Sequence, residues 1–241
     1  MAWYKEWFGE EYLELYSHRD SQEAEAHVDL VARELAGHPP RAVLDLACGA
    51  GRHTAALRRR GYRALGVDLS FTLLAHMREQ SLPMVAGDMR RLPFADESFD
   101  WVLNFFTSFG YFERERENFR VLEEISRVLV PNGCFLIDLL NPDHALANLQ
   151  PREVQETAGR KVEIERWFDA TNQRINKRIR VHSPSGPPRA YLESVRAYRR
   201  EEVVIGLRWA GLEVDRLFGN FHGDPHDRDS ERLILIGHRP V

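Results

Sequence analysis

The sequence predicts an α/β protein with a seven-stranded, mostly parallel β-sheet and an antiparallel β-meander inserted late in the chain. Two features of the 241 residues lead to this fold class. Between residues 42 and 140, short apolar runs alternate with segments whose apolar side chains recur every three or four positions, which is typical of βαβ units. Between residues 162 and 198, polar and apolar residues alternate one by one, which is typical of antiparallel strands with one buried face.

Each expected element is set by its apolar periodicity and by the turn residues that end it. The strands of the large sheet are expected at residues 42–46, 64–67, 84–86, 99–104, 135–140, 212–217 and 233–238. The helices are expected at residues 52–60, 70–80, 113–129 and 201–210, and the meander strands at 162–168, 174–182 and 189–198. Before the first strand, residues 3–16 hold too many aromatic side chains for a solvated tail.

The most informative stretch is the turn after the first expected strand, where Val43 to Gly51 reads VLDLACGAG. Glycine has no Cβ, so such a turn can bend sharply and a ligand can lie against its backbone. The second expected strand ends in Asp68, where a carboxylate is well placed to accept hydrogen bonds from ribose hydroxyls. The turn and the acid together predict a site for a nucleoside cofactor at the carboxyl edge of the sheet.

The spacing of the small residues separates two cofactor classes. A nicotinamide site prefers G-x-G-x-x-G, but counting from Gly49 gives Gly51 and then Thr54 in place of the third glycine. The pattern D-x-A-x-G-x-G from Asp45 instead resembles motif I of the S-adenosylmethionine (SAM)-dependent methyltransferases with a Rossmann-like fold. Ala47 replaces the family's first glycine, and we expect alanine to be tolerated there at a negative φ.

Four further motifs follow in the order that this family shows. They resemble its second, third and fourth strand motifs and the turn before its fifth strand, at residues 66–70, 87–94, 98–104 and 127–135. The resemblance implies that Asp68, followed by Leu69, binds the ribose. It also implies that Asp88 accepts a hydrogen bond from the adenine amino group and that the backbone N–H of Met89 reaches the ring. Asn132 is expected to adopt the left-handed conformation.

Several other cofactor contacts are left with two readings. Asp45 either orients the loop or the donor's amino group, or it caps backbone N–H groups. Arg52 either pairs with the donor carboxylate or is a solvated residue at a helix start. Tyr12 either covers the SAM sulfonium, since tyrosine faces attract cations, or belongs to a hydrophobic helix that packs on the inserted meander. The expected cofactor-binding residues are Tyr12, Asp45, Ala47, Gly49, Gly51, Arg52, Asp68, Leu69, Asp88, Met89, Asn104 and Ser108.

The loop after the fourth strand resembles the aromatic, hydroxyl-containing loop of small-molecule methyltransferases, which would line the methyl group and the acceptor. Residues expected to face the pocket are Asn104, Ser108 and Tyr111, whereas Phe106 or Phe109 is expected in the core. Tyr111 and His222 are the candidate proton acceptors. The loop that carries His222 offers other nitrogen and oxygen ligands, but their spacing does not present them on one face, so no metal is expected.

In this family, a meander inserted after the fifth strand folds over the donor site as a lid. We therefore expect an N-terminal helical cap at residues 1–40, a SAM-binding core at 41–142, the lid at 143–200 and a C-terminal completion of the core sheet at 201–241. The alternative is a meander that only covers a sheet edge or makes a dimer contact.

The net charge of −4 shows no basic bias toward nucleic acid or an anionic membrane. The two cysteines lie in or beside expected strands and suit buried positions. The first residues mix aromatic and acidic side chains without the apolar core of a signal peptide, and no apolar run approaches transmembrane length. We expect a cytoplasmic monomer or homodimer that methylates a small molecule. N-methylation is favoured slightly over O-methylation, because the loop and the meander resemble those of amino-sugar and amine N-methyltransferases. The alternatives are an NAD(P)-linked oxidoreductase and a non-catalytic SAM-binding regulator.

Overall fold

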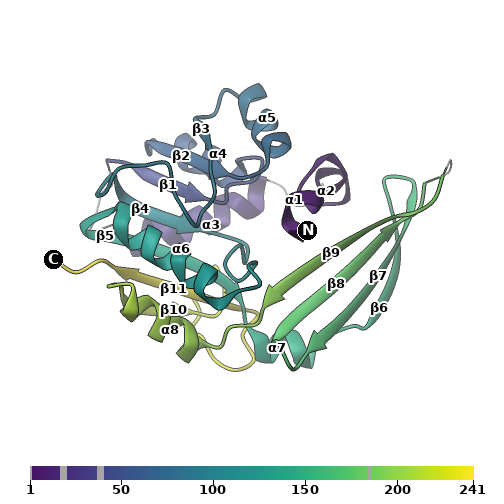
Figure 1. Ribbon diagram of the computed structural model, residues 1–241. Helices are drawn as coiled ribbons and strands as arrows, with labels where there is room; N and C mark the ends of the chain where they lie inside the picture. Colours follow the sequence, from purple (N-terminus) through teal and green to yellow (C-terminus); the bar gives the residue numbers. More distant parts are fainter. Residues whose placement is uncertain (1, 17–20, 37–40, 184–185) are drawn as a thin grey trace.

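Helices pack on both faces of a seven-stranded sheet, and a second sheet of four strands extends from one side of this core (Figure 1). The computed structural model describes residues 2–16, 21–36, 41–183 and 186–241. Within these residues, no helix is long and apolar enough to cross a membrane.

The large sheet has the strand order β10-β11-β5-β4-β1-β2-β3. Its strands are parallel except for β11, which runs antiparallel to both of its neighbours. The strands are β1 (Val43–Leu46), β2 (Ala64–Asp68), β3 (Met84–Ala86), β4 (Phe99–Asn104), β5 (Leu129–Leu140), β10 (Glu213–Phe218) and β11 (Arg232–His238). The predicted fold class is confirmed. The order reverses between β1 and β4, and a crevice at the carboxyl ends of such strands is where ligands bind in open α/β sheets.

The central strands are buried on both faces, which explains their continuous apolar runs. All four residues of β1 are buried, and the helices cover the sheet with apolar faces such as that of Val121, Leu122 and Ile125. Ser70 caps the helix after β2 as expected, because its Oγ accepts a hydrogen bond from the N–H of Leu73 at 3.2 Å. The helices of the core are α3 (Ser21–Glu34), α4 (Arg52–Arg59), α5 (Phe71–Glu79), α6 (Glu115–Val128) and α8 (Arg200–Trp209).

The meander has four strands where three were expected. Its sheet has the order β6-β7-β8-β9, formed by β6 (Arg152–Thr157), β7 (Arg160–Asp169), β8 (Arg174–Val181) and β9 (Arg189–Arg196). The edge strand β6 was not predicted because Val154 is its only large apolar residue, and that side chain is exposed. A short helix α7 (Pro142–Ala147) leads into the meander, and it was also not predicted although Asn141 caps it and proline follows.

Two short N-terminal helices, α1 (Trp3–Trp7) and α2 (Glu10–Leu15), lie beside β9 of the meander (Figure 1). Trp7 and Leu15 are buried in one apolar cluster with the inner face of the meander. On the side of the large sheet, the hydroxyl of Ser70, which follows β2, donates to the carbonyl of Phe8 at 2.7 Å. The N-terminal segment therefore contacts both the meander and the loop after β2, and this placement explains its aromatic composition.

Candidate functional site

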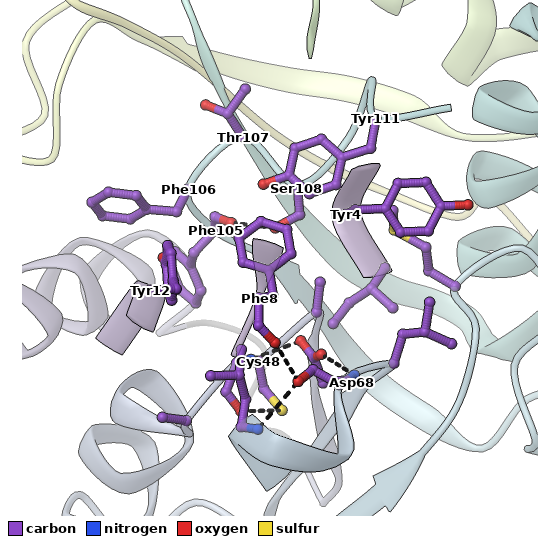
Figure 2. Close-up of a pocket in the computed structure, with 18 of the residues that line it drawn as sticks. Tyr4, Phe8, Tyr12, Cys48, Asp68, Phe105, Phe106, Thr107, Ser108 and Tyr111 are labelled. Carbon is purple, nitrogen blue, oxygen red and sulfur yellow. Dashed lines mark hydrogen bonds between the residues drawn. The ribbon is translucent and has the colours of Figure 1, made fainter. Parts of the chain in front are cut away.

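A cavity of about 960 Å³ lies where the carboxyl ends of the central strands face the N-terminal helices and β9. Its wall includes the turn after β1, Asp68 at the end of β2, and the loop after β4. Figure 2 shows the rings of Tyr4, Phe8, Tyr12 and Tyr111 around the same space as Asp68. Ligand pockets usually measure about 300–1,000 Å³. The cavity is therefore large enough for a cofactor together with a second small molecule.

The turn after β1 has three left-handed residues, Ala47 (φ 58°), Gly49 (φ 58°) and Gly51 (φ 83°). The expectation of a negative φ at Ala47 is wrong: its φ is 58°, a left-handed conformation that costs an alanine about 1–2 kcal/mol. Ala47 and Gly49 line the cavity, whereas Gly51 is buried beneath it. A Cβ on Gly51 would lie 2.7 Å from the side chain of Met77, so this glycine allows close packing of the turn on α5.

Asp68 joins the end of β2 to the glycine turn. Its Oδ2 accepts the N–H of Gly49 at 2.9 Å, and its Oδ1 accepts the N–H of Ser70 at 2.8 Å. Burial raises the pKa of Asp68, although these backbone hydrogen bonds oppose the rise. Both Asp68 and the half-exposed Leu69 line the cavity, so a carboxylate oxygen at this position can meet a ligand hydroxyl.

Asp88, on the loop after β3, also lines the cavity, next to Met89. Arg90 holds the Asp88 carboxylate, with its Nη2 at 2.6 Å from Oδ2 and its backbone N–H at 2.9 Å from Oδ1. Burial alone would raise the pKa of Asp88, but the hydrogen bonds and charge of Arg90 lower it. The ring of Tyr4 packs edge-on against Phe112 nearby, so this end of the cavity combines an ionised acid with apolar walls.

Two residues expected in the site are buried behind the cavity wall. Asp45 is 1% exposed and accepts the hydroxyl of Thr54 at 2.6 Å, which ties β1 to α4. Burial raises the pKa of Asp45 to about 6, against the opposing hydrogen bonds of Thr54. Asn104 does not face the cavity as expected, because its Nδ2 points to β1 and donates to the carbonyl of Leu46 at 2.9 Å. Within the described residues, the Oδ1 of Asn104 has no hydrogen-bond partner.

The loop after β4 is held in an unusual conformation by Asp138, which was not predicted as a site residue. Phe106 and Thr107 both have positive φ values, of 62° and 57°. Asp138 is fully buried on β5, accepts the N–H of Phe106 at 2.7 Å and pairs with Arg232 at 2.7 Å. Arg232 also donates to the hydroxyl of Thr107 at 3.0 Å. This pair turns Phe106, Thr107 and Ser108 toward the cavity. In the sequence, the only sign of the pair is an acidic residue within the apolar run of β5.

Ser108, Tyr111 and Tyr12 line the cavity, as does Phe106, whereas Phe109 is in the core. The ring of Tyr111 packs between those of Trp3 and Phe8, at centroid distances of 4.8 and 5.7 Å. Tyr12 packs edge-on against Phe8 at 5.0 Å. The N-terminal helices therefore supply much of the aromatic wall around the loop after β4.

The candidate proton acceptor His222 lies outside the site. Its side chain is exposed in the loop between β10 and β11 and is not part of the cavity wall. The turn that carries it is closed by Asn220, whose Oδ1 accepts the N–H of His222 at 3.0 Å. The described residues contain no cluster of three or more His, Cys, Asp or Glu that could hold a metal ion.

Arg52 and His53, at the start of α4, line the cavity beside Phe106. Arg52 pairs with Glu23, and its guanidinium carbon lies 4.4 Å from the centroid of Phe106. The Nε2 of His53 lies 3.0 Å from the Nδ1 of His27, and burial lowers the pKa of both rings, that of His27 to about 3. Both imidazoles are therefore neutral, and the positive charges beside Phe106 are those of Arg52 and Arg232.

The comparisons with known proteins agree with this geometry. A methyltransferase domain model matches residues 43–133. The chain is 30% identical over 203 residues to a cypemycin N-terminal methyltransferase from Streptomyces, covering 81% of this chain and 82% of that protein. The chain belongs to the SAM-dependent methyltransferase family.

Solved structures of other methyltransferases have the same fold as this chain. A SAM-dependent methyltransferase from Clostridium acetobutylicum superimposes with a TM-score of 0.80 at 18% identity, covering 95% of this chain and 96% of that one. A sugar N-methyltransferase from Streptoalloteichus superimposes with a TM-score of 0.72 at 25% identity, covering 97% of this chain and 94% of that one.

The residues of the cavity fit SAM, the methyl donor of this enzyme family. The left-handed turn exposes backbone at Ala47 and Gly49, Asp68 presents a carboxylate at the end of β2, and Asp88 presents a second one after β3. Backbone groups and carboxylates of this kind suit the polar groups of such a donor.

Proposed function

We propose that this methyltransferase transfers the methyl group of SAM to an amine nitrogen of a small acceptor. The observation that carries the proposal is the size and lining of the cavity, which continues past the Asp68 end toward Ser108, Tyr111 and the aromatic N-terminal helices. Aromatic faces attract organic cations, and amines are cationic near neutral pH. One relative in sequence is named a cypemycin N-terminal methyltransferase, and one protein with the same fold is named a sugar N-methyltransferase.

The proposed cofactor contacts are the backbone of Ala47 and Gly49, the ribose ligand Asp68 with Leu69, and the adenine ligands Asp88 and Met89. At the other end of the donor, Arg52 is proposed to pair with the carboxylate, while Ser108 and Tyr12 lie near the reacting groups. All of these residues line the cavity. Asp45 and Gly51 are proposed to act indirectly, by holding the turn in place.

Methyl transfer is an in-line displacement, so positioning can supply much of the rate enhancement. Bound SAM supplies an electrophilic methyl group on a sulfonium. The loop held by Asp138 and Arg232 fixes Ser108 and the backbone beside the acceptor. The N-terminal helices and the meander are proposed to act as a lid that excludes water, and Tyr111 is the proposed acceptor of a proton from the nucleophile.

The proposal is tested by incubating the protein with SAM carrying a labelled methyl group and matched panels of primary amines and phenols. We expect label in the amines. Label confined to the phenols would contradict N-methylation. Tyr111→Phe should lower kcat and leave the affinity for SAM unchanged, and an unaltered kcat would contradict the proton-acceptor role.

A further inference from the structure

The meander places one carboxylate, that of Glu193, in the wall of the cavity. Glu193 lies on β9 directly opposite Lys177 of β8, so both side chains project from the inner face of the sheet. This face packs against Trp7 and the other aromatic residues of the N-terminal helices. The Glu193 side chain is 24% exposed. It is therefore a largely enclosed acid that still reaches the cavity.

Three neighbours fix the Glu193 carboxylate. The indole N–H of Trp7 donates to Oε1 at 2.6 Å, and the hydroxyl of Tyr16 lies 3.5 Å from the same oxygen. The Nζ of Lys177 lies 3.6 Å from Oε2, and it also donates to the hydroxyl of Tyr16. Lys177 is not part of the cavity wall, so it supports the carboxylate from behind.

The other acids of the cavity wall have different surroundings. Within the described residues these are Glu6, which is exposed, and Asp68 and Asp88, which are the proposed adenosine contacts. Tyr12 and Tyr16 line the cavity on the side of Glu193, where their rings pack at a centroid distance of 5.0 Å. A fixed carboxylate beside aromatic faces is a favourable environment for an organic ammonium ion.

We propose that Glu193 binds the ammonium group of the acceptor, and this inference rests on the proposed N-methyltransferase function. The nitrogen must lose one proton before it reacts, and this proton passes to the ionised oxygen of Tyr111, the acceptor proposed above, so that an N–H bond breaks as an O–H bond forms. The freed lone pair then forms the N–C bond while the S–C bond of the donor breaks and its electron pair stays on sulfur. Glu193 thereby selects amines over neutral acceptors of the same shape.

The test uses protein saturated with S-adenosylhomocysteine, and 2-phenylethylamine and 2-phenylethanol as a matched pair of probes in calorimetry. The proposal predicts that the amine binds at least about tenfold more tightly than the alcohol. A charge-assisted hydrogen bond predicts that Glu193→Gln weakens amine binding about 10- to 100-fold and leaves alcohol binding within about threefold. Lys177→Met should strengthen amine binding, because it removes a competing cation behind the carboxylate.

Glu165→Gln is the matched control. Glu165 pairs with Arg178, which stands opposite Leu192, so Glu165 lies on the outer face of the same sheet. Equal affinities for amine and alcohol, no binding of either probe, or an unaltered amine affinity in Glu193→Gln would each overturn the proposal. Loss of S-adenosylhomocysteine binding in Glu193→Gln would also overturn it, because the role would then be structural. A wild-type protein that does not bind S-adenosylhomocysteine would instead contradict the proposed function itself.

Discussion

The substitution Asp68→Asn removes one charge from the proposed ribose site and keeps the shape of the side chain. In the wild type, both carboxylate oxygens accept backbone N–H groups, from Gly49 at 2.9 Å and from Ser70 at 2.8 Å. Asparagine offers one acceptor oxygen, so its amide group would face one of these N–H donors. Hydrogen bonds to a charged group contribute about 1.5–3 kcal/mol. We therefore expect the affinity for SAM to fall about 10- to 100-fold.

Isothermal titration calorimetry with SAM measures this loss, and thermal unfolding reports whether the fold persists. Asp169→Asn is a matched control, because Asp169 also accepts backbone N–H groups, those of Thr171 and Asn172, in a turn of the meander outside the cavity. The control should bind SAM like the wild type. An Asp68→Asn protein that is folded and binds SAM with unaltered affinity would refute the assignment of Asp68.

Three further predictions concern the residues around the turn and the N-terminal segment. Burial raises the pKa of Asp45 from 3.8 to about 6, so its stabilising contribution is complete below pH 3.8 and is lost as the pH rises through 6. Between pH 4 and 7, the wild type should therefore lose up to about 3 kcal/mol more unfolding free energy than Asp45→Asn. Denaturant titrations of both proteins at several pH values measure this difference, and equal pH profiles would contradict it. In the same assay, Gly51→Ala should destabilise the protein by about 1–3 kcal/mol more than Gly61→Ala. Both glycines have a positive φ, but only a Cβ on Gly51 meets Met77. Equal losses of stability in the two variants would argue against tight packing of the turn. Removal of residues 1–16 should speed the dissociation of S-adenosylhomocysteine about tenfold or more, as measured by stopped flow. The reason is that losing the burial of even one aromatic side chain costs about 1.5–3 kcal/mol. An unaltered dissociation rate would show that this segment does not cover the site.

The sequence predicts those parts of the site that are local in the chain. The turn after β1 and the acid at the end of β2 are each defined by a few consecutive residues, and the parallel sheet brings Gly49 and Asp68 to hydrogen-bond distance. The left-handed conformation expected at Asn132 is present, with φ 60°. At Ala47, the residue type alone favours a negative φ, but the tight turn between β1 and α4 places it at a φ of 58°.

The residues that close the cavity could not be predicted, because they come from distant parts of the chain. Trp7 and Glu193 are 186 positions apart, and only the packing of α1 on β9 joins them. Asp138 and Arg232 meet through the antiparallel pairing of β5 and β11. His222 shows the opposite case, since a chemically suitable side chain is carried away from the site by its loop.

We propose that the cavity at the carboxyl ends of β1, β2 and β4 holds the methyl donor, with Asp68 on its ribose. A crystal structure of the complex with S-adenosylhomocysteine tests this claim most directly. We expect the ribose hydroxyls within hydrogen-bond distance of Asp68 and the sulfur facing the loop that carries Ser108. A complex in which the ligand occupies another place, or lies in the cavity without contact to Asp68, would contradict the account.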